Sequence, residues 1–292
     1  MVEAHDPYFV QKQDVIEVIG LFSLQKMTTT MRMLIYGVAA DFMDDYVRIG
    51  ENTVIESLER FVKAVVVIFS DVYLRMPHNN DIAKLLAVGK NHGFLEMLGS
   101  SDFFGLPGSH NDINVLEHSF VFSVFAEGHA PPINYSINGH DYKMGYYLAD
   151  GIYPQWPTFV KTISCPQGNK QLHFAKAQES ARKDVERAFG VLQAHFAIVQ
   201  GHAHFWKCET LKDIMKACII LHNMIIENKQ NVNNIDFNYD AIDGSPPLSV
   251  SHKCTSELYE FIQNHHYIRD RQTHSKLQED LIEHLWHQYG DS

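Results

Sequence analysis

Two carboxylates stand at positions from which they can converge on one divalent cation. Asp150 ends a predicted strand over residues 143–149, and Glu186 lies on a predicted helix over residues 175–195. Phosphodiester cleavage by two metals needs clustered carboxylates, because the metals they hold activate water and stabilise the leaving group. Mg²⁺ prefers oxygen ligands and keeps several waters, so a few carboxylates suffice. Asp150 and Glu186 are therefore our candidate catalytic residues and our candidate ligands for Mg²⁺ or Mn²⁺.

Each carboxylate also has an ordinary structural explanation. Glu186 follows Arg182 by four residues and Lys183 by three, and solvated ion pairs along a helix contribute only roughly a few tenths of a kcal/mol. Asp150-Gly151 is a common turn signal. Taken singly, each carboxylate is more often structural than catalytic, and only the sequence around both of them reverses this balance.

Basic residues gather around Glu186 although the chain as a whole is acidic. Contact with DNA phosphates beside a metal site would use such residues. Solvated loop and helix charges explain them equally well. The candidate DNA-binding residues are Lys161, Lys176, Arg182, Lys183 and Arg187.

The bulk composition limits the classes of protein that this chain can represent. Its 292 residues are 45% hydrophobic, enough for a substantial core, and its formal net charge of −11 argues against non-specific coating of nucleic acid. The four cysteines form no CxxC pair, which favours a reducing compartment. The N-terminus lacks the pattern of a signal peptide, and the apolar run at residues 64–69 is too short to span a bilayer. We therefore expect an intracellular protein with no membrane partner.

Apolar periodicity predicts a helix-rich chain with few strands. Several helices are expected over residues 24–89, with Thr53 capping one of them and Glu56 completing a capping box. A loop-rich stretch follows residue 150, with a short helix near residues 159–163. Beyond Lys229 the composition turns polar, as in a linker. Further helices are expected over residues 111–125, 175–195, 211–228, 255–264 and 275–288.

Six segments together resemble the plant PIF/Harbinger-type transposase-derived nucleases. The resemblance reaches to about Asn228 and implies an RNase H-like core, an Asp-Asp-Glu metal site, DNA as substrate and a nuclear location. By position, the second Asp of that site falls on Asp150 and its Glu on Glu186. A separate DNA-binding or chromatin protein is a further candidate partner. The segments include LQKMTTTMRMLIYGVAADFMDDYVRIGENT, YLRMPHNNDIAKLL, GLPGSHNDINVLEHS, YYLADGIYPQWPTFVKTI, AKAQESARKDVERAFGVLQAHFAIV and IMKACIILHNMIIE.

The resemblance predicts three regions in an α+β, helix-rich fold. Residues 1–97 form an all-α N-terminal domain that could contain a helix-turn-helix. Residues 98–230 form a truncated RNase H-like nuclease domain, and residues 231–292 form a polar linker with a C-terminal helical tail. No Lys/Arg-rich cluster marks a nuclear signal, so the nuclear location rests on the resemblance and the alternative is cytoplasmic.

The sequence departs from the family between residues 97 and 109. Members of the family run from Met-Leu-Gly-Ser into a strand that carries the first catalytic Asp, then into a hairpin. Here Ser100 is followed almost directly by Gly105, so we expect that the first strand, its Asp and most of the hairpin are lost. Asp102 is disfavoured as a substitute because no strand is expected before it, and Asp112 is better interpreted as a helix cap.

Losing one carboxylate removes a metal ligand and negative charge, so we expect little or no Mg²⁺-dependent cleavage. The chain would then be a transposase-derived endonuclease with impaired chemistry. Two alternatives stay open at this point. One is a domesticated, non-catalytic protein that binds chromatin or partner proteins, and the other is a decayed transposon copy or a mis-spliced gene product.

Overall fold

The computed structural model describes residues 1–13, 19–100, 133–151, 153, 155–200, 207–233 and 270–289. These residues form two compact units, each built from two stretches of the chain. Unit 1 comprises Met1–Met76 and Arg187–Gly244, and unit 2 comprises Pro77–Glu186 and Ser245–Ser292. Helices predominate over a small sheet, which confirms the helix-rich α+β class. The domain boundaries at residues 97 and 230 stay a prediction.

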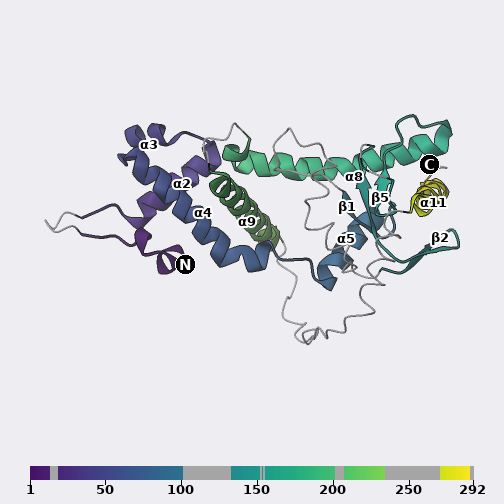
Figure 1. Ribbon diagram of the computed structural model, residues 1–292, viewed down its shortest axis with the longest axis horizontal. Helices are drawn as coiled ribbons and strands as arrows, with labels where there is room; N and C mark the ends of the chain where they lie inside the picture. Colours follow the sequence, from purple (N-terminus) through teal and green to yellow (C-terminus); the bar gives the residue numbers. More distant parts are fainter. Residues whose placement is uncertain are drawn as a thin grey trace. The chain divides into compact units, whose positions relative to one another are not determined.

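Unit 1 is built from helices, of which α4 and α9 lie side by side (Figure 1). The long helix α8 contributes its residues from Arg187 onward to this unit. None of the described helices of the chain is long and apolar enough to cross a membrane. The elements of unit 1 are α1 (Val2–His5), η1 (Pro7–Phe9), α2 (Ser23–Tyr36), α3 (Ala40–Val47), α4 (Glu51–Tyr73), the end of α8 (Gly168–His195), η2 (Ala197–Val199) and α9 (Cys208–Asn233).

The predicted helical stripes form the core of unit 1. Leu58, Val62 and Val65 on α4 are buried at helical spacing, and α9 buries Ile214 and Cys218 one turn apart. Burial raises the pKa of the Cys218 thiol to about 12, so this cysteine packs as an apolar side chain. The periodicity of the sequence therefore predicts both the helices and the faces that they bury.

Two helix ends of unit 1 test the local sequence signals. Helix α2 ends before Gly37, whose φ of +63° lies in the left-handed region that favours glycine. The prediction that Thr53 caps the next helix is wrong, because α4 begins at Glu51 after Gly50. Thr53 lies inside the first turn, and the Glu56 carboxylate accepts a hydrogen bond from Arg60 at 2.9 Å.

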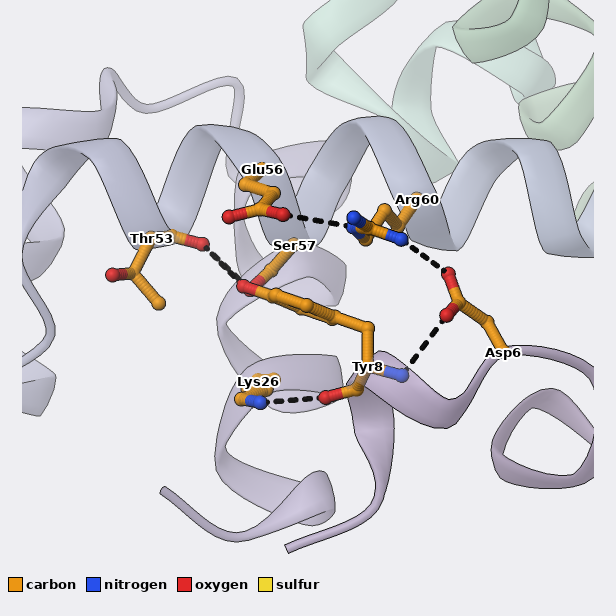
Figure 2. Close-up of polar contacts among 7 residues, drawn as sticks. All are labelled: Asp6, Tyr8, Lys26, Thr53, Glu56, Ser57 and Arg60. Atoms are coloured by element: carbon orange, nitrogen blue, oxygen red, sulfur yellow. Dashed lines mark hydrogen bonds and ion pairs between the residues drawn. The ribbon is translucent and has the colours of Figure 1, made fainter. Parts of the chain in front are cut away.

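The N-terminal segment is anchored on α2 and α4 by a polar cluster around Tyr8 (Figure 2). The Tyr8 hydroxyl lies 3.0 Å from Ser57 Oγ and 3.3 Å from the backbone carbonyl of Thr53. Lys26 Nζ donates to the Tyr8 carbonyl at 2.7 Å and lies 4.1 Å from the centre of the Tyr8 ring. Arg60 Cζ lies 4.8 Å from the same centre, so two cations contact one aromatic ring.

Asp6 completes this cluster. Its carboxylate accepts a hydrogen bond from the Tyr8 backbone N–H at 2.9 Å and another from Arg60 Nη1 at 3.2 Å. The Tyr8 N–H is the main cause that lowers the pKa of Asp6, with Arg60 adding to it. The cluster joins residues that are far apart in the sequence, and no local pattern predicts it.

Two histidines meet between the end of α8 and α9. His195 Nδ1 and His222 Nδ1 lie 3.1 Å apart, so one ring donates its proton to the other. The side chain of His222 is buried, with 7% of its surface exposed. Burial, with the nearby His195 adding to it, lowers the pKa of His222 below the ordinary value of 6.5.

Unit 2 contains a three-stranded parallel sheet in the order β1-β4-β5 and a separate antiparallel hairpin of β2 and β3. In the sheet, Ser100 pairs with Leu148, and Leu148 pairs with Val160. The elements of unit 2 are α5 (Asn79–Asn91), β1 (Met97–Ser100), β2 (Tyr135–Ile137), β3 (His140–Tyr142), β4 (Tyr146–Ala149), β5 (Phe159–Lys161), the start of α8 and α11 (Arg271–Tyr289).

One sequence prediction for this sheet is wrong, and one strand was not predicted. The segment 159–163, expected as a short helix, contains strand β5, because Phe159 and Val160 are buried against β4 and so short an apolar run fits either structure. Strand β1 over Met97–Ser100, which pairs in parallel with β4, was not predicted from the sequence. Strand β1 is difficult to predict from residue propensities, because it contains Gly99 and its pairing register shifts after Met97. The strand expected to be lost would follow Ser100, and residues 101–132 lie outside the described part of the chain.

Helix α11 covers the sheet of unit 2 and belongs to its core. Leu277 and Leu281 are buried at helical spacing, and α11 contacts β5. The buried Asp280 carboxylate accepts a hydrogen bond from the Tyr142 hydroxyl at 2.6 Å and lies 2.8 Å from His140 Nδ1. The hairpin is therefore tied to a helix far away in the sequence. The other predicted C-terminal helix, over residues 255–264, lies outside the described residues, as does the one over residues 111–125.

Substitution of Tyr8 by Phe should lower the free energy of unfolding of unit 1 by about 1 kcal/mol, because it removes the hydroxyl that bonds the buried Ser57. Urea unfolding measures the difference. Tyr36→Phe is the matched control, because the Tyr36 side chain is exposed. A loss no larger than that of the control would show that the Tyr8 hydroxyl contributes nothing to the anchor.

Stability should fall as the solution is acidified below about pH 6.5, because protonation of the buried His222 is favoured in the unfolded chain. A histidine with a lowered pKa stabilises the fold above its unfolded value and loses this contribution as pH falls. Urea unfolding between pH 7.5 and 5 should show a smaller loss for His222→Gln than for the parent chain. His287→Gln, at an exposed position, should lose as much as the parent. Equal losses in all three would contradict the assignment.

Candidate functional site

Asp150 lies at the carboxyl end of a buried strand. In β4 the side chains of Tyr146, Leu148 and Ala149 are buried, and Asp150 is the first half-exposed residue beyond them. The Ala149 carbonyl accepts a hydrogen bond from the Thr162 N–H at 3.1 Å, so the pairing with the β5 side continues to the edge of the sheet. Because β1, β4 and β5 are parallel, their carboxyl ends meet at this edge, where ligands commonly bind.

Helix α8 is fixed against the sheet one turn before Arg182. Gln178 is buried, and its Nε2 donates to the Val160 carbonyl at 2.8 Å. Phe174 and Ala181 are buried on the same stripe of the helix. This packing positions the next turn of α8 above the carboxyl end of β4. There the Arg182 guanidinium forms an ion pair with the Asp150 carboxylate through Nη1 and Oδ1.

The two partners of this ion pair differ in their exposure. The Arg182 side chain is 18% exposed and the Asp150 side chain is 48% exposed. The Arg182 Nε is buried and has no hydrogen-bond partner within the described part of the chain. Sequence spacing could not reveal this pair, because it joins a strand end to a helix through the fold. Arg182, predicted as a phosphate contact, is thus engaged with the predicted metal ligand.

Glu186 lies on α8 one turn after Arg182 and is exposed. Residues four apart on a helix share a face, so Glu186 follows Arg182 along the side of α8 that carries the ion pair. The predicted apolar stripe next to it is confirmed in part, because Leu192 and Phe196 are buried while Val185 and Phe189 are half-buried.

The remaining candidate DNA-binding residues have different surroundings. Lys161 ends β5 half-buried, and burial lowers the pKa of its amine. Lys183 forms an ion pair with Glu179 at 2.8 Å, one turn earlier on α8. Lys176 is exposed, and Arg187 is exposed in the part of α8 that belongs to unit 1. Of this set, Arg182 forms an ion pair with the carboxylate of Asp150.

The described residues do not fit a pair of divalent metals. Asp150 and Glu186 offer oxygen ligands of the right kind, but Arg182 already neutralises Asp150. Across the described part of the chain, no group of three or more His, Cys, Asp or Glu side chains is placed to hold a metal ion. We therefore derive no catalytic step through a metal from these residues.

The expectation that no strand precedes Asp102 is wrong, because strand β1 ends two residues before it. Ser100, the last residue of β1, pairs with Leu148, and Asp150 follows Leu148 by two residues just as Asp102 follows Ser100. Asp102 itself lies outside the described residues, and so does Asp112. Asp102 is thus the residue to test as the first carboxylate.

A second concentration of charge lies in unit 1, beside the N-terminal anchor. A groove of about 510 Å³ is lined there by His5, Asp6, Glu56, Glu59, Arg60, Lys63 and Ala64. Most of its charges are paired within the unit, since Arg60 forms ion pairs with Asp6 and Glu56, while Lys207 Nζ lies 3.8 Å from Glu59 Oε1. This groove is accordingly a weaker candidate site than the edge of the sheet.

Comparison with known proteins gives one match. Residues 101–233 match a family model described as Plant transposon protein. The matched stretch is less than half of the chain and includes β4, Asp150, α8 and Glu186. No curated protein and no solved structure matches the chain. The family match supports an origin of this protein from a plant transposon, as the resemblance predicted.

Proposed function

We propose that this chain is a PIF/Harbinger-type, transposase-derived endonuclease relative whose metal-dependent cleavage of DNA is impaired. The proposal includes a truncated RNase H-like core over residues 98–230, with Asp150 and Glu186 as remnants of its Mg²⁺ or Mn²⁺ site. The observation that carries it is the parallel order β1-β4-β5, with Asp150 at the carboxyl edge and α8 packed beside it. The match to a plant transposon protein supports the same origin.

Two features support impaired chemistry. The Arg182 guanidinium neutralises Asp150, so the charge that would attract a divalent cation is reduced. Within the described residues, no group of three or more His, Cys, Asp or Glu side chains is placed to hold a metal ion.

DNA is the proposed partner, and the nucleus is the proposed location. Lys176 and Lys183 are exposed on α8 and can contact phosphate, while Lys161, Arg182 and Arg187 are the further candidates. Binding through these residues would be electrostatic and would weaken as salt is raised. A separate DNA-binding or chromatin protein would supply sequence recognition if the chain itself has none.

A second candidate function is a non-catalytic module that binds chromatin or partner proteins. The Asp150–Arg182 ion pair favours it, because the pair stabilises the edge of the sheet without any metal. A decayed transposon copy is the third alternative, and folding separates it from the second. A chain that is monodisperse and unfolds cooperatively is expected for a functional module, whereas a decayed copy should aggregate.

Incubation of the full chain with supercoiled DNA and Mn²⁺ or Mg²⁺ should give little or no nicking above that of Glu186→Gln. The physical reason is the reduced negative charge and the incomplete ligand set at the sheet edge. Asp150→Asn and Asp102→Asn are measured in parallel, and Glu179→Gln is the control for loss of a carboxylate elsewhere on α8.

Clear metal-dependent nicking that Glu186→Gln abolishes and Glu179→Gln preserves would overturn the impairment. Loss of that nicking in Asp102→Asn as well would identify Asp102 as the first carboxylate. Fluorescence anisotropy of a short, labelled DNA duplex tests DNA binding separately from cleavage. Binding that weakens with salt, without nicking, is the result expected from the proposal.

A further inference from the structure

The carboxylate at the end of β4 already has a cation. The Arg182 guanidinium forms an ion pair with Asp150, and it comes from the same helix that carries Glu186. We infer that Arg182 is a built-in counter-cation at Asp150, so that a divalent metal gains this carboxylate only by displacing the guanidinium. The inference rests on the proposed function, because it treats Asp150 as the remnant of a metal ligand.

The fold holds Arg182 in this position. Gln178, four residues earlier on α8, is bonded to the carbonyl of Val160, and Val160 pairs with Leu148 in β4. Ala181 is buried next to Arg182. The backbone of α8 is therefore fixed relative to the end of β4, and the arginine side chain needs little reorganisation to reach Asp150.

The surroundings of the guanidinium favour the ion pair over solvent. The Arg182 side chain is mostly buried, so its charge is only partly hydrated and gains from a neighbouring carboxylate. Arginine keeps its charge at any ordinary pH, unlike a histidine or a buried lysine.

Arg182 also competes with a metal ion for the carboxylate of Glu186. It lies one turn after Arg182 on α8, where a displaced guanidinium can form an ordinary helical ion pair with it. A metal that takes Asp150 would then leave Arg182 free to neutralise Glu186. One arginine thus opposes the use of both carboxylates by one metal.

Removal of the guanidinium should raise the affinity of the full chain for Mn²⁺ by about tenfold or more, because one unit of positive charge leaves the site. Mn²⁺ alone is the probe, and the signal of free Mn²⁺ in electron paramagnetic resonance gives the bound fraction. Arg182→Gln is expected to bind more tightly than the parent chain. The double variant Arg182→Gln with Asp150→Asn should lose the gain. Lys84→Gln, which removes an exposed charge from α5 of the same unit, should bind as the parent does.

Arg182→Gln leaves Asp150 without its partner, so folding is checked by thermal unfolding followed by circular dichroism. If that variant does not unfold in one transition, Arg182→Lys carries the test. Lysine keeps the charge but lacks the planar fork that binds a carboxylate, so Mn²⁺ should displace it more easily and bind several-fold more tightly than to the parent.

Equal Mn²⁺ affinity in the parent chain and in the folded Arg182 variant would overturn the inference. A gain that persists when Asp150 is replaced would also overturn it, since the metal would then bind elsewhere. The proposed function fails in a different way. If the parent chain nicks DNA while Arg182→Gln gains Mn²⁺ through Asp150, the impairment is wrong and the counter-cation stands.

Discussion

Strand β4 is buried between two parallel neighbours, and the rest of unit 2 depends on this pairing. Strands β1 and β5 and the helices that cover the sheet bury the side chains of Tyr146, Leu148 and Ala149. Burial of a side chain such as that of Leu148 contributes on the order of 2 kcal/mol, and a slip by one residue would turn it to the opposite face, so the register of β4 is strongly specified. A fixed register in turn fixes Asp150 at the carboxyl edge, where α8 passes.

At that edge, the single positive charge of Arg182 decides whether Asp150 can bind a divalent metal ion. Without a neighbouring cation, the negative charge of the Asp150 carboxylate would attract a divalent metal ion. In the ion pair, the positive charge of Arg182 cancels this attraction. Breaking such a partly buried ion pair leaves a charge without a partner. The ion pair is therefore maintained once α8 has packed against the sheet. The same contact therefore stabilises the fold and opposes the chemistry that the resemblance implies.

The helices of this protein could be predicted because their signals are local. The stripe through Leu58 and Val62, the left-handed Gly37 and the long apolar α9 all act within one or two turns. Strands β1 and β5 escaped prediction because each has only three or four residues and takes its conformation from pairing with β4. A propensity argument does not see a partner that lies some fifty residues away.

In the candidate site, too, some features could be predicted from the sequence and others could not. Asp150 and Glu186 were found from the segments that surround them, and the structure places Asp150 at a strand end and Glu186 on a helix, where the sequence expected them. The role of Arg182 could not be found, because its spacing to Glu186 suggests a solvated helical pair and its contact with Asp150 exists only in the folded chain. The Tyr8 anchor is a second case, since its groups come from three separate segments.

The most direct test of this account is a crystal of the full chain grown or soaked with Mn²⁺, with an anomalous difference map calculated at the edge of the sheet. The account predicts that the Arg182 guanidinium is found against the Asp150 carboxylate and that no anomalous peak lies between Asp150 and Glu186. A Mn²⁺ ion bound to Asp150 and Glu186 in the parent chain, with Arg182 turned away, would contradict it.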